Sequence, residues 1–221
     1  MKREIIETGD GSKTIFVPAL GEQYHSIHGA LVEAQHVFLK NGLHAIDKQQ
    51  ISILEMGFGT GLNAFLTFLE NISLGKNIRY TALEAFPVES DLLNQLDYVK
   101  TIGAEKRKGV FEQMHDCGWG VEEQVSDQFC LHKIVAKLQE VEFENSFDLI
   151  YFDAFSPGVQ PELWSEEIFG KLYAKMNKGG VLVTYCAKGS VKRALKAVGF
   201  QVESLEGPPG KREMTRAKKS N

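Results

Sequence analysis

The chain has 221 residues, 43% of them hydrophobic and 24% charged, and its formal net charge is −4. This is an ordinary globular composition, which excludes disordered and fibrous proteins. The polar N-terminus is unlike a signal peptide, and Cys117, Cys130 and Cys186 form no C-x-x-C pair, so we expect a cytoplasmic protein with no metal site and no membrane span. No Pro- or Ser-rich linker divides the chain. We therefore expect one domain over residues 1–221, with an N-terminal extension and covering helix (1–45) before the core (46–221).

The first 45 residues predict a small extension. A G-D-G-S turn at 9–12 precedes a strand candidate at 14–17, and a helix that starts at His28 is ended by Asn41 and Gly42. Because this helix comes before the first core strand, it is a candidate cover for a ligand site. His25 and His36 are interpreted as hydrogen-bonded structural side chains.

The segment 51–63, ISILEMGFGTGLN, combines a buried strand, a glycine turn and the start of a helix at Leu62. Glycines at alternate positions let the backbone turn sharply, so main-chain N–H groups and a helix N-terminus can lie against a flat or charged ligand. The spacing is E-x-G-x-G-x-G rather than the dinucleotide pattern G-x-G-x-x-G. It resembles motif I of class I methyltransferases, which bind S-adenosylmethionine; the alternative is a plain tight turn. The candidate ligand-binding residues here are Glu55, Gly57, Phe58, Gly59, Thr60, Gly61 and Asn63.

The second core strand, 79–83, ends in Glu84, which lies 23 residues after Gly61. An acid at this place can accept hydrogen bonds from ribose hydroxyls, although a solvated carboxylate is the alternative. Pro87 is expected to open a helix that runs through Leu96. Residues 101–128 are interpreted as helix and loop, because several glycines interrupt the periodicity.

The third and fourth strands are expected at 129–135 and 147–152, and the fourth is almost wholly apolar and therefore central. It ends in Asp153, where ligands of open α/β sheets bind. A carboxylate there can hydrogen-bond an amine, orient it towards an electrophilic methyl group and accept its proton. Phe155 and Trp164 could stack on a flat base. The alternatives are a cap for Asp153 and plain packing for the two aromatic residues.

The rest of the chain predicts a helix at 162–176, a strand at 181–185, a helix capped by Ser190, and strands at 200–205 and 214–217 that form a hairpin. Strands and helices alternate throughout. We expect an α/β, Rossmann-like fold with a seven-stranded, mostly parallel sheet, an antiparallel edge strand and helices on both faces.

Charge is distributed unevenly along the chain. From Lys188 onward there are nine basic and three acidic residues, which give +6, so the preceding residues carry −10. A basic end of this kind is typical of a surface that binds RNA, but it is equally typical of a solvated helix face.

Several segments together resemble one family, the methyltransferase half of the bifunctional tRNA-modification enzyme MnmC and its standalone form, MnmD. They are YHSIHGALVEAQHVFLKNGL, LEMGFGTGLN, LEAFPV, FDLIYFDAFSPGVQPELW and GFQVESLEGPPGKREMTRA. The resemblance implies transfer of a methyl group from S-adenosylmethionine to the 5-aminomethyl group of (2-thio)uridine at the tRNA wobble position, in the anticodon loop. The product would be 5-methylaminomethyl(2-thio)uridine.

The resemblance also implies roles for residues. Gly57, Phe58, Gly59, Thr60, Asn63 and Glu84 would hold the donor, Asp153 would be the catalytic carboxylate, and five basic residues would face tRNA phosphates: Lys188, Lys192, Arg193, Lys211 and Arg212. The family usually has an acid after the third strand to receive the adenine amino group. Here Ala136 and Lys137 occupy that place, and a lysine cannot accept the bond. Backbone groups or another side chain would then hold adenine.

Bifunctional members also carry an FAD-dependent oxidase domain, for which 221 residues leave no room. We therefore expect no oxidoreductase activity, and we expect a separate enzyme to supply the aminomethylated uridine. Three other functions stay open: an aminopropyltransferase of the spermidine-synthase type, a methyltransferase of small amines or proteins, and a non-catalytic RNA-binding module.

Overall fold

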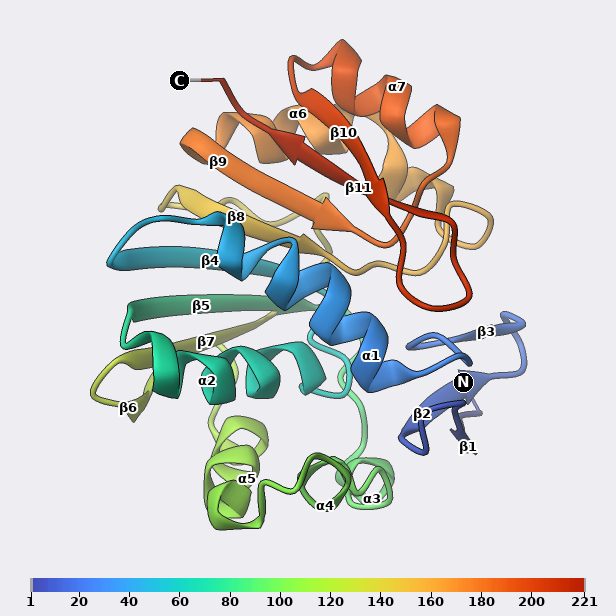
Figure 1. Cartoon of the computed structure of the whole chain (residues 1–221), viewed down its shortest axis with the longest axis vertical. Helices are drawn as coiled ribbons and strands as arrows, with labels where there is room; N and C mark the ends of the chain where they lie inside the picture. Colours follow the sequence, from blue (N-terminus) through green and yellow to red (C-terminus); the bar gives the residue numbers. More distant parts are fainter. Residues whose placement is uncertain (1, 221) are drawn as a thin grey trace.

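The computed structural model describes residues 2–220 and is built on one eight-stranded sheet (Figure 1). The strand order is β10-β11-β9-β8-β4-β5-β7-β6. The five strands from β9 to β7 are parallel to one another, whereas β6, β10 and β11 pair antiparallel. In chain order the strands are β4 (Gln50–Met56), β5 (Asn77–Glu84), β6 (Glu122–Ser126), β7 (Phe129–Val135), β8 (Phe147–Phe152), β9 (Met176–Thr184), β10 (Gln201–Glu206) and β11 (Glu213–Lys218).

The predicted Rossmann-like class is confirmed, but the expected count of seven strands is wrong by one. The additional strand is β6, which lies at the sheet edge beside β7. Its five residues, EEQVS, bury only Val125, because one face and one edge are left to solvent. A short, polar edge strand carries little hydrophobic pattern, and so the sequence did not reveal it.

Helices cover both faces of the sheet, as expected. Figure 1 shows α1 (Ala30–Ala34) and α2 (Leu62–Leu74) on one face, with α6 (Glu166–Ala174) and α7 (Gly189–Ala197) on the other side of the strands. Side chains alternate along a strand. Ile53 therefore packs in the cluster that contains α2, and Leu54 packs in the cluster that contains α6 and α7.

The remaining helical segments are short. Helix α1 continues directly as a π-helix, Gln35–Lys40, so the covering helix predicted from His28 begins at Ala30. Between β5 and β6 lie α3 (Ser90–Leu93), α4 (Tyr98–Ile102) and α5 (Lys108–Asp116), and 3₁₀ turns occur at Leu43–Ala45, Glu105–Arg107 and Pro161–Trp164.

Three expected boundaries were wrong. The helix expected from Pro87 to Leu96 is reduced to the four residues of α3. The helix expected at 162–176 ends at Ala174, and Met176 already belongs to β9, where it pairs with Phe147 before the register shifts to Leu149 and Val181. A β-bulge thus accommodates the N-K-G-G segment, residues 177–180, which follows the end of the expected helix. Ser190 lies inside α7 and does not cap it; Lys188 is the N-cap residue.

The N-terminal extension forms a separate antiparallel sheet of β1 (Glu4–Glu7), β2 (Lys13–Val17) and β3 (Glu22–Gln23). The predicted turn between β1 and β2 supplies two side chains that accept hydrogen bonds from N–H groups at the N-terminus of α1. Asp10 Oδ2 accepts a 3.0 Å hydrogen bond from Val32 N, and Ser12 Oγ accepts one of 3.2 Å from Ala30 N. Because these N–H groups have no partner within the helix, the turn fixes where α1 starts. Among residues 2–220, no helix combines the length and the apolar character that crossing a membrane requires.

Candidate active site

A cavity of about 890 Å³ opens at the carboxyl ends of β4, β5 and β8, which is where open α/β sheets bind ligands. The N-terminal sheet and the loop between β10 and β11 form its outer walls. Residues that line it include Arg3, Glu22, Tyr24, Glu33, Gly57, Gly59, Glu84, Phe86, Ala136, Lys137, Asp153, Phe155, Tyr185 and Lys211. A hollow of about 480 Å³ at the opposite ends of β4 and β5 contains none of these residues.

The glycine turn combines positive φ angles with close neighbours, and both features explain why it needs glycine. Gly57, Gly59 and Gly61 have φ angles of +89°, +51° and +71°, a region that side chains with a Cβ rarely adopt. A Cβ on Gly57 would lie 3.1 Å from Asp153 O, and a Cβ on Gly59 would lie 3.1 Å from the Tyr24 ring. Gly57 and Gly59 therefore bring bare backbone to the cavity wall.

Glu84 is held rigidly beside this turn. Its Oε2 accepts a 2.9 Å hydrogen bond from Gly59 N, and its Oε1 accepts one of 2.8 Å from Phe86 N. Each carboxylate oxygen keeps a further lone pair for a ligand. The geometry fits the acceptance of hydrogen bonds from the two hydroxyls of a ribose.

Asp153 lies at the end of β8 and faces the cavity. Asn63 Nδ2 donates a 2.8 Å hydrogen bond to Asp153 Oδ2. Although Asp153 is only partly hidden from solvent, burial raises the pKa of its carboxyl to about 7, and the negative charge of Glu33 also raises it. The hydrogen bond from Asn63 and the positive charge of Lys211 act in the opposite direction. A carboxyl with this pKa can both take up and release a proton near neutral pH.

Glu55 lies beneath this group and is fully buried. Burial raises the pKa of Glu55 well above its usual range, and the charge of Asp153 raises it further. Neither of its carboxyl oxygens has a hydrogen-bond partner among the described residues. Its side chain does not line the cavity, so its predicted part in donor binding is at most indirect.

Other predicted residues support the turn from beneath. Phe58 is buried, with its ring centroid 5.4 Å from that of His115 and 5.9 Å from that of Trp119. Thr60 is also buried, with its Oγ1 3.5 Å from Nε2 of His25. The side chains of Phe58, Thr60 and Asn63 do not line the cavity. They hold the backbone of the turn and Asp153 in place, and His25 has the structural role that the sequence suggested.

The two aromatic residues expected to stack on a base have different positions. Phe155 lines the cavity, and its ring meets that of Tyr24 edge to face at a centroid distance of 5.3 Å. Trp164 is 6% exposed, packs against Phe152, and donates a 2.9 Å hydrogen bond from Nε1 to Phe155 O. Plain packing, the alternative interpretation, therefore describes Trp164, which positions Phe155 from behind.

Ala136 and Lys137 line the cavity at the place where an acid was expected. Ala136 N donates a 3.1 Å hydrogen bond to Glu84 O, and Lys137 is exposed with its Nζ 3.6 Å from Oε1 of Glu140. Nearby on the lining, Phe86 exposes 57% of its surface. This wall offers apolar surface and backbone groups in place of the carboxylate.

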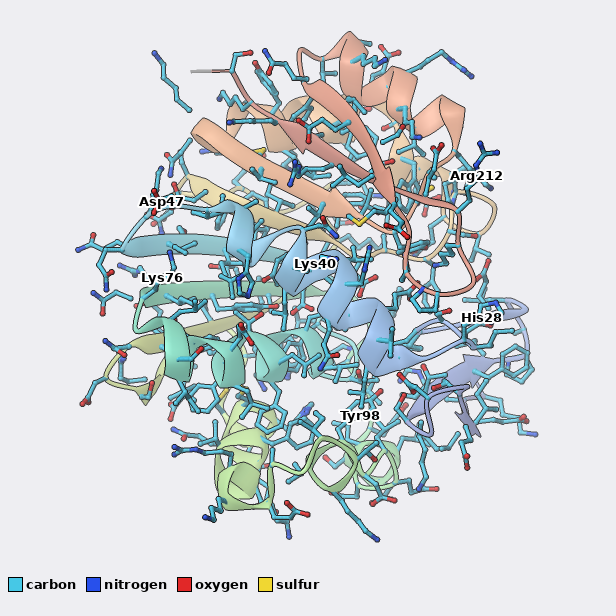
Figure 2. All side chains as sticks on the ribbon, in the orientation of Figure 1. His28, Lys40, Asp47, Lys76, Tyr98 and Arg212 are labelled. Atoms are coloured by element: carbon cyan, nitrogen blue, oxygen red, sulfur yellow. The ribbon has the colours of Figure 1, made fainter. Side chains whose placement is uncertain are left out.

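The five basic residues expected at tRNA divide into two groups. Lys188, Arg193 and Arg212 are exposed, and Figure 2 shows Arg212 on the outer side of the β10–β11 loop. Lys192 Nζ instead lies 2.7 Å from both Ser204 Oγ and Glu213 Oε2. Lys211 lines the cavity and forms an ion pair with Glu33.

Several cavity residues were not identified from the sequence, among them Tyr24, Glu33 and Tyr185. Tyr24 and Glu33 belong to the extension and covering helix, and the single signal for them was the suggestion that this helix covers the ligand site. Tyr185 follows β9 directly, and its hydroxyl donates a 2.8 Å hydrogen bond to Ala154 O. Its position at a strand end is the signal that could have found it.

The strand order, the glycine turn after the first core strand and the acid at the end of the second define the class I methyltransferase fold. A model of the family described as S-adenosyl-L-methionine-dependent methyltransferases matches residues 108–220, and the chain belongs to this family. The donor is therefore S-adenosylmethionine, and the bare backbone at Gly57 and Gly59 together with Glu84 provides a place that fits it.

Curated relatives are bifunctional proteins of tRNA 5-methylaminomethyl-2-thiouridine biosynthesis, MnmC. The protein from Delftia acidovorans is 32% identical over 212 residues, covering 90% of this chain and 32% of its own length. That from Cupriavidus metallidurans is 30% identical, covering 97% of this chain and 34% of its own length. This chain thus spans about a third of the relatives it matches.

Solved structures agree with this assignment. MNMC2 from Aquifex aeolicus superposes with a TM-score of 0.72 and 26% identity, covering 98% of this chain and 70% of that one. Spermidine synthase from Thermotoga maritima has a TM-score of 0.57 at 15% identity, covering 99% of this chain and 68% of that one. At that identity the second similarity shows the fold alone.

Proposed function

We propose that this chain methylates the 5-aminomethyl group of (2-thio)uridine at the tRNA wobble position, giving 5-methylaminomethyl(2-thio)uridine, with S-adenosylmethionine as donor. The names of the MnmC relatives and the similarity to MNMC2 over 98% of the chain support this substrate. The observation that carries the proposal is the place of Asp153, whose carboxyl lies at the cavity surface and is held by Asn63; burial raises its pKa to about 7, which agrees with a role in proton transfer. An amine needs such a group, because it is protonated in water and must lose a proton before its nitrogen can attack a methyl group.

In this mechanism the chain contributes mainly positioning and proton transfer. S-adenosylmethionine supplies an electrophilic methyl group when bound. Asn63 fixes the orientation of Asp153 through the 2.8 Å hydrogen bond. The ionised Asp153 first accepts a proton from the substrate ammonium, which frees the nitrogen lone pair. A hydrogen bond from a remaining N–H to the carboxyl then aligns this lone pair with the methyl group.

For donor binding, we propose that the backbone of Gly57 and Gly59 approaches the donor and that Glu84 accepts hydrogen bonds from its ribose. Backbone groups at Ala136 and Lys137 and the exposed ring of Phe86 would hold adenine, since Lys137 cannot accept a bond from its amino group. Glu55, Phe58, Thr60 and Gly61 would act by supporting the turn.

For tRNA binding, the uridine must leave its stack in the anticodon loop before its substituent can reach Asp153. We propose that it stacks on Phe155 beside Tyr24. The exposed Lys188, Arg193 and Arg212 would contact phosphates around the cavity. Lys192 is engaged by Glu213 and would contribute less.

The proposal has three further parts. Residues 1–221 act as one methyltransferase domain, with the segment 1–45 closing the cavity over the core. A separate enzyme supplies the aminomethylated uridine. As tRNA is the substrate, the cytoplasm is the expected location.

The direct test is transfer of a labelled methyl group from S-adenosylmethionine to bulk tRNA from cells that lack this enzyme, followed by nucleoside analysis. Label in 5-methylaminomethyl uridine is the expected result. If tRNA stays unlabelled while a titration shows donor binding, the substrate is a small amine or a protein. The same fold also occurs in spermidine synthase, so decarboxylated donor with a diamine serves as the comparison reaction.

A further inference from the structure

A salt bridge inside the cavity joins two segments that are far apart in the sequence. Lys211, in the loop between β10 and β11, pairs with Glu33 of α1 at an Nζ–Oε2 distance of 2.5 Å. Glu33 is 7% exposed, and its other oxygen accepts a 3.0 Å hydrogen bond from Ser26 N. The Glu33 carboxylate is therefore held away from bulk solvent, whereas the Lys211 side chain keeps 30% of its surface exposed. Charge interactions are stronger at such a partly buried pair than on the open surface.

The ammonium of Lys211 also lies over the face of Tyr185, 4.2 Å from the ring centroid. Tyr185 is tied to the backbone next to Asp153, because its hydroxyl donates to Ala154 O at 2.8 Å. This cation–π contact and the pairing with Glu33 hold the ammonium of Lys211, which lines the same cavity as Asp153.

The loop that carries Lys211 is docked firmly on the covering helix. His36 Nε2 lies 2.8 Å from Glu206 O, at the start of the loop. A Cβ on Gly210 would fall 2.3 Å from the His28 ring, so the backbone next to Lys211 lies directly against His28, which Figure 2 marks at this edge of the molecule. Lys211 is thus partly buried against Glu33 and Tyr185, unlike the exposed Arg212 that follows it.

We propose that Lys211 and Glu33 are positioning residues of the methyl transfer: their paired charges set the charge state of Asp153, and Lys211 does not serve as a phosphate contact. This inference deepens the proposed function, because it assigns the control of the group that accepts the substrate proton. The two charges act in opposite directions. The positive charge of Lys211 lowers the pKa of the Asp153 carboxyl, whereas the negative charge of Glu33 raises it.

Other groups around Asp153 complete its electrostatic surroundings. Glu55 of β4 lies beneath it, Tyr80 of β5 and Tyr185 after β9 also face it, and the neutral amide of Asn63 donates to it from α2. Burial raises the pKa of Glu55, Tyr80 and Tyr185 well above their usual ranges, so all three favour the uncharged form near neutral pH. Lys211 and Glu33 are then the charged pair that can be altered to move the titration of Asp153.

The test is an NMR titration of the Asp153 carboxyl carbon in the full chain without tRNA, with the signal assigned by its loss in Asp153→Asn. Glu33→Gln can keep an acceptor oxygen for Ser26 N but removes the negative charge, so the midpoint should fall by ~0.5 pH unit or more. Lys211→Met removes the positive charge, so the midpoint should rise by a similar amount. Lys196→Met, which removes an exposed lysine of α7, is the control and should leave the midpoint unchanged.

Opposite shifts in the two variants support the proposal, because a merely structural contact would not move the midpoint in opposite directions. An unchanged midpoint in either variant, or shifts of the same sign, would overturn it. If Lys211→Met does not fold, Lys211→Gln takes its place with the same expected rise. Because the titration needs neither tRNA nor methyl transfer, it can fail independently of the proposed substrate.

Discussion

Asn63 Nδ2 donates a 2.8 Å hydrogen bond to Asp153 Oδ2, which joins the first turn of α2 to the end of β8. The two residues are 90 positions apart, yet each follows directly from a core strand and its turn. The segment proposed to approach the donor and the segment proposed to accept the proton are thereby held together. Substitutions at this contact should separate donor binding from chemistry.

Asp153→Asn should retain S-adenosylmethionine binding and lose methyl transfer by ~10²–10⁴-fold, since an amide cannot accept the proton of the substrate nitrogen. In the unaltered protein the rate should rise with pH through about 7, as Asp153 becomes ionised. Donor binding is measured by calorimetric titration and turnover by label transfer. Unchanged turnover in Asp153→Asn would remove Asp153 from the mechanism.

The same substitution should stabilise the fold in a pH-dependent way. Burial raises the pKa of Asp153 from 3.8 to about 7, so the folded protein binds this proton more tightly than the unfolded chain does. The free energy of unfolding therefore decreases as pH rises from about 4 to about 7, and the loss is complete above that. Asp153→Asn should be more stable than the unaltered protein by ~1–2 kcal/mol at pH 8, a value reduced for water in the cavity, with no difference at pH 4. Urea midpoints at the two pH values measure this; a difference that is equal at both would contradict it.

Gly59→Ala should weaken S-adenosylmethionine binding by ~10-fold or more, because the added Cβ would lie 3.1 Å from the Tyr24 ring and the backbone has a φ of +51°. Gly75→Ala is the matched control at the other end of α2. There φ is +63° and nothing lies within 4 Å, so that variant should lose only ~1 kcal/mol of stability. Equal donor affinity in the two variants would show that the turn is not the donor site.

Arg193→Met combined with Arg212→Met should raise the KM for tRNA several-fold and reduce the salt dependence of binding by ~1 unit of slope for each phosphate that the protein no longer neutralises. The kcat and the affinity for the donor should not change, since both side chains are exposed and outside the cavity. Lys192→Met is the comparison, and its effect should be smaller because Lys192 is paired with Glu213. A larger effect from Lys192→Met than from the double variant would reverse this assignment.

The core of the fold could be predicted because its signals are local. The apolar strand 147–152, the glycine turn and the acid that ends β5 each follow from a short segment of sequence, and strand ends converge in a parallel sheet. The edge strand β6 could not be predicted, since its residues are mostly polar and its pairing partner determines it. Met176 was wrongly expected in a helix. Its place in β9 depends on a β-bulge, and the pairing with Phe147 that defines this bulge is not visible in the local sequence.

The outer wall of the site was harder to predict than its base. Tyr24 and Glu33 come from segments that precede the core and meet it only through tertiary packing. A count of charges identified the basic C-terminal region but could not separate Lys211, paired with Glu33 inside the cavity, from Arg212, which is exposed. Trp164 shows the same limit, because an aromatic residue near a strand end is equally suited to the core.

The position of β11 has a consequence for how the molecule forms during synthesis. Residues 213–218 insert between β9 and β10, although both of those strands precede them in the chain. Until residues 213–218 have left the ribosome, the edge of β9 that β11 later covers has no antiparallel neighbour. The loop that carries Lys211 is then not yet fixed against Glu33. A nascent chain in which the glycine turn and the strand that ends at Asp153 have already folded therefore still lacks one side of its cavity. A chain that stalls before β11 exposes the edge of β9, which can pair with other chains and aggregate.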